Sequence, residues 1–153
     1  MRRLSHLNAR GEASMVDVSA KPVQLRVAIA RGEIRLAKAT LKLIESNRIA
    51  KGNVLATARL AGILAAKKTG ELIPLCHPLP ITHCEVNFET PKSCDRIVIT
   101  ASAKIASQTG IEMEALTAVS LAALTIYDMC KAVDKKMRVT DVRLVSKTKT
   151  PIA

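Results

Sequence analysis

The sequence predicts a single α+β domain, built on a ferredoxin-like antiparallel sheet with helices packed on one face. Three observations support this fold class. The chain has 153 residues, the size of one compact domain. Hydrophobic residues make up 48% of it, which is enough for a core. The periodicity of apolar residues predicts elements in the order strand, helices, strand, strand, helix, strand.

The first half of the chain contains the first strand and two helices. Residues 1–22 are expected to be an extended arm that Gly11 and Pro22 interrupt. Apolar residues alternate from Val23 to Ala30, which predicts a strand, and Gly32 marks a bulge or bend in its continuation. Residues 40–46 and 53–68 are expected to form helices. Three prolines then predict a stiff, irregular loop over residues 74–80.

The second half contains a strand pair, the longest helix and a last strand. Alternation over residues 84–88 and 97–101 predicts the strand pair. A helix rich in Ala, Leu and Val is expected from Glu112 to about Asp134, and most of its circumference should be buried. Residues 139–145 are expected to form the last strand, with an irregularity near Asp141. We therefore assign the domain to residues 23–147 and a short basic tail to residues 148–153.

Charge and composition limit the classes of partner. The net charge is +11, which favours anionic partners such as a polyphosphate substrate, nucleic acid or acidic lipid, although a basic surface without a special partner is also common. Phe88 and Tyr127 are the only aromatic residues, too few to stack a single-stranded nucleic acid, whereas binding of a duplex through its phosphates stays open. No apolar run is long enough to span a membrane. The four cysteines form no Cys-x-x-Cys pair, so we expect reduced thiols in the cytoplasm.

Two polar segments in the first half of the chain are candidates for chemistry. Lys51 precedes Gly52 at the predicted start of a helix, where an anion is favoured, although a solvated lysine is common there too. His77 lies between two prolines after Leu75 and Cys76, so its ring is either held for chemistry or simply hydrogen-bonded. These residues with His83 and Cys84 offer metal ligands, but adjacent Cys and His ligands strain a tetrahedral site. We expect no metal.

The long predicted helix carries polar candidates near both ends. Asp128 and Lys131 are three residues apart and share a face, either as a surface ion pair or as a lysine tuned for proton transfer. Glu112 and Glu114 precede Asp128 by 14 residues or more, which is roughly 21 Å or more along a helix. One small-molecule site within a single chain can hardly use both ends. Either the two acids are structural, or the site is assembled between subunits.

Five motifs resemble the cyclic pyranopterin monophosphate synthase family, the protein C family of molybdenum cofactor biosynthesis, over roughly residues 4–147. They are Met15 to Ser19, Lys51 to Val54, Leu72 to Pro78, Thr109 to Thr117 and Leu124 to Ala132, in that order along the chain. The resemblance implies a ferredoxin-like subunit in a homo-hexamer, a trimer of dimers with sites at subunit interfaces. It implies a lyase that converts 3′,8-cyclo-7,8-dihydro-GTP to cyclic pyranopterin monophosphate and releases diphosphate, with no cofactor, nucleic acid or membrane partner.

The resemblance also assigns roles by position. It implies that Asp128, Lys51 and Lys131 are catalytic, and that Leu75, Cys76, His77, Met113 and Glu114 line the substrate pocket, with Glu112 as a further candidate. The family usually ends with a Gly-Gly-Lys-Ser-Gly tail, but residues 147–153 read Lys-Thr-Lys-Thr-Pro-Ile-Ala. The alternatives are an inactive family member and a non-enzymatic basic nucleic-acid-binding module. The last would show a continuous basic stripe instead of lysines in a cleft.

Overall fold

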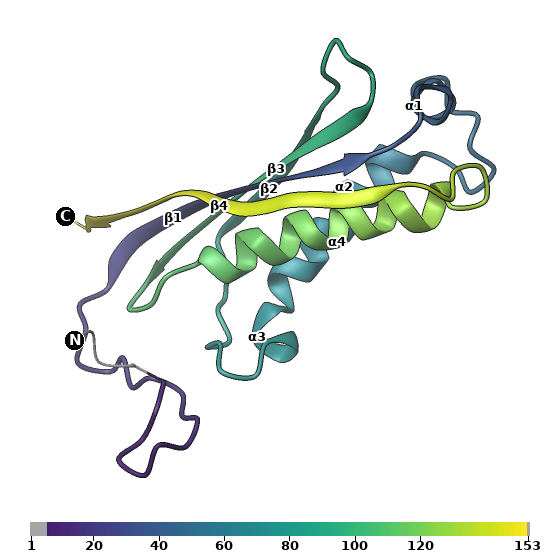
Figure 1. The fold of residues 1–153 in the computed structure, drawn as a ribbon. Helices are drawn as coiled ribbons and strands as arrows, with labels where there is room; N and C mark the ends of the chain where they lie inside the picture. The colour runs from purple at the N-terminus through teal and green to yellow at the C-terminus, as the bar shows by residue number, and fades with distance from the viewer. Residues whose placement is uncertain (1–5, 153) are drawn as a thin grey trace.

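The computed structural model describes residues 6–152, and its centre is a four-stranded antiparallel sheet in the order β2-β3-β1-β4 (Figure 1). The strands are β1 (Gln24–Arg35), β2 (His83–Glu89), β3 (Arg96–Ser107) and β4 (Arg138–Pro151). The helices are α1 (Lys38–Glu45), α2 (Val54–Lys67), α3 (Thr69–Leu72) and α4 (Glu112–Cys130). The predicted α+β class and the order of elements are confirmed.

The core lies between the sheet and α4, which packs on the same face of the sheet as α2 (Figure 1). Every second residue of β1 faces this layer, so Ala28, Ala30 and Ile34 are buried. Gly32 lies on the same face. A Cβ atom at this position would lie 2.6 Å from the side chain of Val119 of α4, which is too close for any residue larger than glycine. Small residues in β1 therefore let α4 approach the sheet closely.

Helix α4 is long and apolar enough to cross a membrane by length and composition, but most of it is core. Ten of its side chains are buried against the sheet and α2. A helix that is apolar around most of its circumference is the expected centre of a two-layer domain. The expectation that this helix is largely buried is therefore confirmed.

Strand β4 differs from the sequence prediction in length. The strand continues to Pro151, and its last residues pair with β1 as Ala28↔Lys147 and Gln24↔Pro151. Residues 148–151 read Thr-Lys-Thr-Pro and have no apolar face, so periodicity did not reveal them; the neighbouring β1 supplies the backbone partners. The predicted irregularity near Asp141 is confirmed, because this residue has a φ of 56° and the register with β1 shifts there.

The prediction that the long helix reaches Asp134 is wrong, since α4 ends at Cys130. The backbone N–H groups of Val133 and Asp134 both donate to the carbonyl of Cys130, which forms a tight turn. The carboxylate of Asp134 then accepts from the backbone N–H of Ala37 and the hydroxyl of Thr40, at 2.8 and 3.0 Å. It satisfies donors at the start of α1 in place of a local cap. The short helix α3 was also not predicted.

Candidate active site

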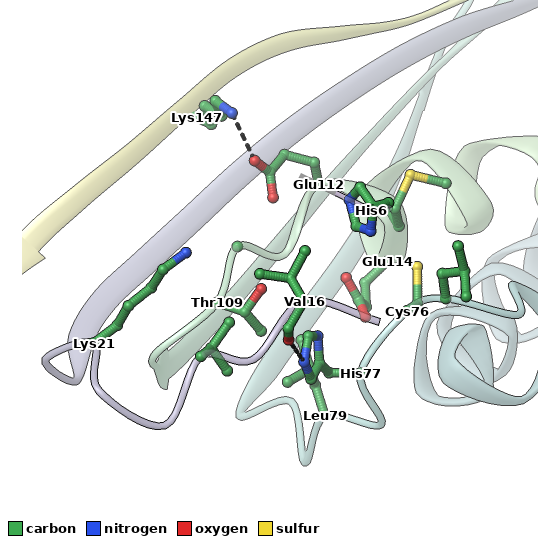
Figure 2. A pocket seen from close by; sticks show the side chains of 14 residues that line it. His6, Val16, Lys21, Cys76, His77, Leu79, Thr109, Glu112, Glu114 and Lys147 are labelled. Carbon is green, nitrogen blue, oxygen red and sulfur yellow. Dashed lines mark hydrogen bonds and ion pairs between the residues drawn. The ribbon is translucent and has the colours of Figure 1, made fainter. Parts of the chain in front are cut away.

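A cavity of about 630 Å³ lies beside the N-terminus of α4 (Figure 2). Its walls come from the N-terminal arm, the loop after α3, the loop before α4, the first turn of α4, and β4. The lining residues are His6, Val16, Val18, Lys21, Leu75, Cys76, His77, Leu79, Thr109, Gly110, Glu112, Met113, Glu114 and Lys147. The structure thus brings together all six residues that the sequence analysis associated with substrate binding.

Glu114 is a buried carboxyl on this cavity, with 3% of its surface exposed. Burial raises its pKa to about 7, and the negative charge of Glu112 adds to that rise. A carboxylate loses its hydration when it is buried, so the protonated form is favoured. At neutral pH this carboxyl is therefore divided between its two protonation states, which suits proton transfer in either direction.

Glu112 lies two residues earlier and has the opposite electrostatic setting. Burial acts to raise its pKa, but a hydrogen bond from the Lys147 ammonium at 2.8 Å, a backbone hydrogen bond and the charges of Lys147 and Arg26 together outweigh burial, so the pKa lies below its usual value. Glu112 is therefore ionised at neutral pH. Two carboxyls on one cavity are held in different protonation states by their neighbours.

His77 and Cys76 face the cavity from the proline-flanked loop. The ring nitrogen Nε2 of His77 lies 2.9 Å from the backbone carbonyl of Val16. Because a carbonyl oxygen only accepts, Nε2 carries the proton in this contact. Burial, with a further contribution from the charge of Glu114, raises the pKa of the Cys76 thiol, which is therefore neutral at pH 7.

Lys51, Asp128 and Lys131 form a second polar group at the other end of α4. The Asp128 carboxylate accepts from the Lys51 ammonium at 2.8 Å and from the Lys131 ammonium at 2.7 Å. Lys51 also donates to the Asp128 backbone carbonyl at 3.0 Å. Gly52, with a φ of 103°, turns the chain between Lys51 and the start of α2. This turn lets the lysine reach α4.

The two lysines set the charge of this group. Hydrogen bonds from Lys131 and Lys51 lower the pKa of Asp128 to about 2. In return, the hydrogen bond to Asp128 raises the pKa of Lys131. All three side chains are about half exposed. The group therefore presents two ammonium groups to solvent, both arranged around one ionised carboxylate.

The cavity and the Lys51–Asp128–Lys131 group are not brought together within one chain. None of these three residues lines the cavity. Asp128 follows Glu114 by 14 residues of α4, which is roughly 21 Å along the helix axis. The structure therefore keeps open the sequence-based inference that one site uses residues of two subunits.

Several residues of the cavity were not identified as functional from the sequence. Val16, Val18 and Lys21 come from the arm, Thr109 from the loop before α4, and Lys147 from β4. The arm had a signal only through its resemblance to the family, because no local chemistry marks it. Among residues 6–152 no three His, Cys, Asp or Glu side chains form a metal-binding group. Cys84 packs against the core, while His83 is exposed.

Comparison with known proteins identifies the family. A family model described as the MoaC family matches residues 15–150. The chain belongs to the MoaC family. It is 59% identical to a cyclic pyranopterin monophosphate synthase of Dinoroseobacter shibae, with 96% of this chain and 93% of the relative covered. Proteins of that name from Chloroflexus aggregans (57%; 95% and 88% covered) and Parvibaculum lavamentivorans (54%; 96% and 92% covered) are also similar. The resemblance stated from the sequence motifs is confirmed.

Proposed function

We propose that this protein converts 3′,8-cyclo-7,8-dihydro-GTP to cyclic pyranopterin monophosphate and diphosphate, as a lyase of molybdenum cofactor biosynthesis. The family and the printed names of relatives covered over almost their whole length support this reaction. The single observation that carries it in the structure is the cavity, around which all six predicted substrate-binding residues meet.

The side chains of the cavity offer the proton donors and acceptors that such a rearrangement needs. The reaction opens the five-membered ring of the purine and closes a pyrazine ring, so protons must be added to and removed from ring nitrogens. Glu114 exchanges a proton near neutral pH because its pKa is about 7. The Cys76 thiol and His77 line the same space. We propose that these three side chains bind the base and move its protons.

The Lys51–Asp128–Lys131 group suits the phosphate chemistry. A hydroxyl derived from ribose attacks the α-phosphorus, and diphosphate leaves with negative charge that cations stabilise. Both ammonium groups are held within 2.8 Å of the Asp128 carboxylate. Because this contact raises the pKa of Lys131, the lysine is held in its charged form. We propose that Lys131 and Lys51 act as acids and electrostatic stabilisers, and that Asp128 orients them.

We further propose that the working site is shared between two copies of the chain. The exposed surface of the helical layer carries large apolar side chains, namely Leu60, Leu64 and Leu124. A second copy related by a two-fold axis, with its α4 antiparallel to the first, would cover this surface. It would also bring its Asp128 end to the Glu114 end of the first copy. Both halves of the site are then complete, and three such dimers make the expected hexamer.

The same proposal includes a cytoplasmic location, no cofactor or metal and no nucleic-acid partner. The four cysteines, all within the described residues, are unpaired. The alternative of a nucleic-acid-binding module is less well supported, because several cations of the candidate site are engaged by carboxylates. Lys51 and Lys131 contact Asp128, and Lys147 contacts Glu112. A phosphate-binding stripe would keep its cations free for the nucleic acid.

Incubation of the purified protein with the cyclised GTP tests the reaction directly. We expect one pterin product and one diphosphate for each substrate molecule consumed. The matched control is Asp128→Asn, which keeps the shape of the side chain but removes the charge that holds both lysines. Absence of both products with the unaltered protein, under conditions in which a relative named as this synthase forms them, would refute the proposed activity.

A further inference from the structure

The N-terminal arm forms one wall of the cavity and is tied to the domain at two places. At the first, the ring of His77 donates to the carbonyl of Val16 at 2.9 Å. At the second, the side-chain amide of Gln108 donates to the carbonyls of Ser19 and Lys21, each at 3.0 Å. Two carbonyl acceptors require the nitrogen of that amide, so its orientation is determined.

Local hydrogen bonds give the arm its shape between these two places. The Asp17 carboxylate accepts from the backbone N–H and the hydroxyl of Ser19, at 2.9 and 2.7 Å. The backbone N–H of Lys21 donates to the carbonyl of Val18 at 2.9 Å. These bonds form a turn but do not attach it to the sheet or to α4. Gln108 supplies that attachment next to Lys21.

Gln108 is itself well placed to act as an anchor. It lies in the loop between β3 and α4, and the Arg26 guanidinium of β1 donates to the carbonyls of Ser107 and Gln108, at 3.4 and 3.1 Å. The loop is thus tied to the central strand, and the arm is tied to the loop. A continuous set of hydrogen bonds runs from the sheet to the backbone of Lys21.

Lys21 lines the cavity, and its side chain extends toward the side where Glu112 and Lys147 lie (Figure 2). Lys147 is neutralised there by Glu112 at 2.8 Å. Lys21, in contrast, has no ion-pair partner among residues 6–152. An ammonium without a carboxylate partner at the edge of a cavity attracts an anionic ligand.

We propose that Lys21 is a further binding residue for the phosphate groups of the nucleotide substrate, and that Gln108 is the residue that positions it. This inference rests on the proposed function insofar as that function makes the substrate a nucleoside triphosphate derivative. The side-chain amide of Gln108 donates to the arm, and Gln108 acts through Lys21. The arm is therefore part of the binding site as well as a covering of the cavity.

Steady-state kinetics with the cyclised GTP test both roles. A lost contact between a charged group and phosphate corresponds to roughly a 10- to 100-fold rise in KM, so Lys21→Ala should show a rise of that size with a smaller change in kcat. Lys21→Arg keeps the charge and should restore most of the affinity. Gln108→Ala should raise KM by about 2- to 10-fold, the range for neutral hydrogen bonds. The control is Gln24→Ala, which removes the second of the two glutamines in the chain. Gln24 does not line the cavity and takes no part in the hydrogen bonds from Gln108 to the arm, so this variant should leave KM unchanged.

The double variant Lys21→Ala, Gln108→Ala separates positioning from independent binding. If Gln108 acts through Lys21, the double variant has the KM of Lys21→Ala alone. The inference would be overturned if the rise in KM of the double variant equalled the product of the rises in the two single variants. An unchanged KM in Lys21→Ala would also overturn it. Calorimetry with GTP and guanosine as probes makes the test independent of turnover. Lys21→Ala should weaken GTP binding and leave guanosine binding unchanged, whereas equal GTP affinity in the variant and the unaltered protein refutes the role of Lys21 even if the proposed reaction fails.

Discussion

Replacing Glu114 with Gln should change the pH dependence of stability in a predictable direction. The carboxyl has a pKa of about 7 in the folded protein, against an ordinary value of 4.5. Above pH 4.5 the unfolded chain releases this proton while the folded protein retains it. The folded state then binds more protons, so this group makes stability fall as pH rises, until its cost is fully present above pH 7. Glutamine keeps the shape of the side chain and removes the titration.

The size of the effect follows from the two pKa values. Between pH 5 and pH 8 the cost of Glu114 grows by about 2.5 kcal/mol, since each pH unit within the window contributes about 1.36 kcal/mol. Glu114→Gln should therefore gain stability relative to the unaltered protein by about that amount over this range, in urea unfolding at equal protein concentration. The control Glu112→Gln should instead lose stability, because it removes a carboxylate whose pKa is lowered by Lys147. A Glu114→Gln difference that is the same at pH 5 and pH 8 would refute a raised pKa.

Four further substitutions have defined outcomes. Lys51→Ala and Lys131→Ala should each reduce product formation by roughly 10²- to 10⁴-fold while circular dichroism and native mass stay unchanged, and near-normal turnover in either would show that lysine to be a solvated surface charge. Asp134→Ala removes the buried carboxylate that caps α1 and should lower the free energy of unfolding by about 1–3 kcal/mol in urea, whereas an unchanged value would mean that water replaces the cap. Gly32→Ala should cost about 1–3 kcal/mol in the same assay because its Cβ would contact Val119, and a stabilised variant would contradict the close packing of α4.

The elements that were predicted well are those in which the spacing of apolar and polar side chains reflects which face of the element is buried. The alternation correctly predicted β1 as a strand, but the residues buried against α4 are Ala28, Ala30 and Ile34, whereas the larger apolar side chains of Val27 and Ile29 lie on the opposite face and are only half-buried. The end of β4 shows the opposite case. Residues 148–151 become a strand because β1 offers unpaired backbone groups beside them, and their own side chains carry no apolar pattern. The end of α4 was misplaced since its last turn is replaced by hydrogen bonds to the carbonyl of Cys130.

The candidate site was also predictable only in part from the sequence. The helix length alone separated Glu114 from Asp128, which left two alternatives: either the acids at the start of the helix are structural, or the site is assembled between subunits. Lys51 contacts Asp128 across 77 residues of sequence, and spacing alone could not predict this contact. The two residues were grouped only because the family resemblance assigned both of them to the catalytic set. The raised pKa of Glu114 depends on burial by segments distant in sequence. The contact between His77 and Val16 depends on the path of the arm, which no local pattern specifies.

Mixing inactive variants tests the shared site most directly. His77→Ala impairs the cavity and Lys131→Ala impairs the second group, so a dimer with one copy of each has one intact site and one doubly impaired site. Random pairing of equal amounts should restore about a quarter of the normal activity, because half the dimers are mixed and half of their sites are intact. The control mixture of Lys51→Ala with Lys131→Ala should stay inactive, since both changes lie in the same group. Co-expressed, co-purified His77→Ala and Lys131→Ala chains that remain as inactive as either variant alone would contradict a site built from two subunits.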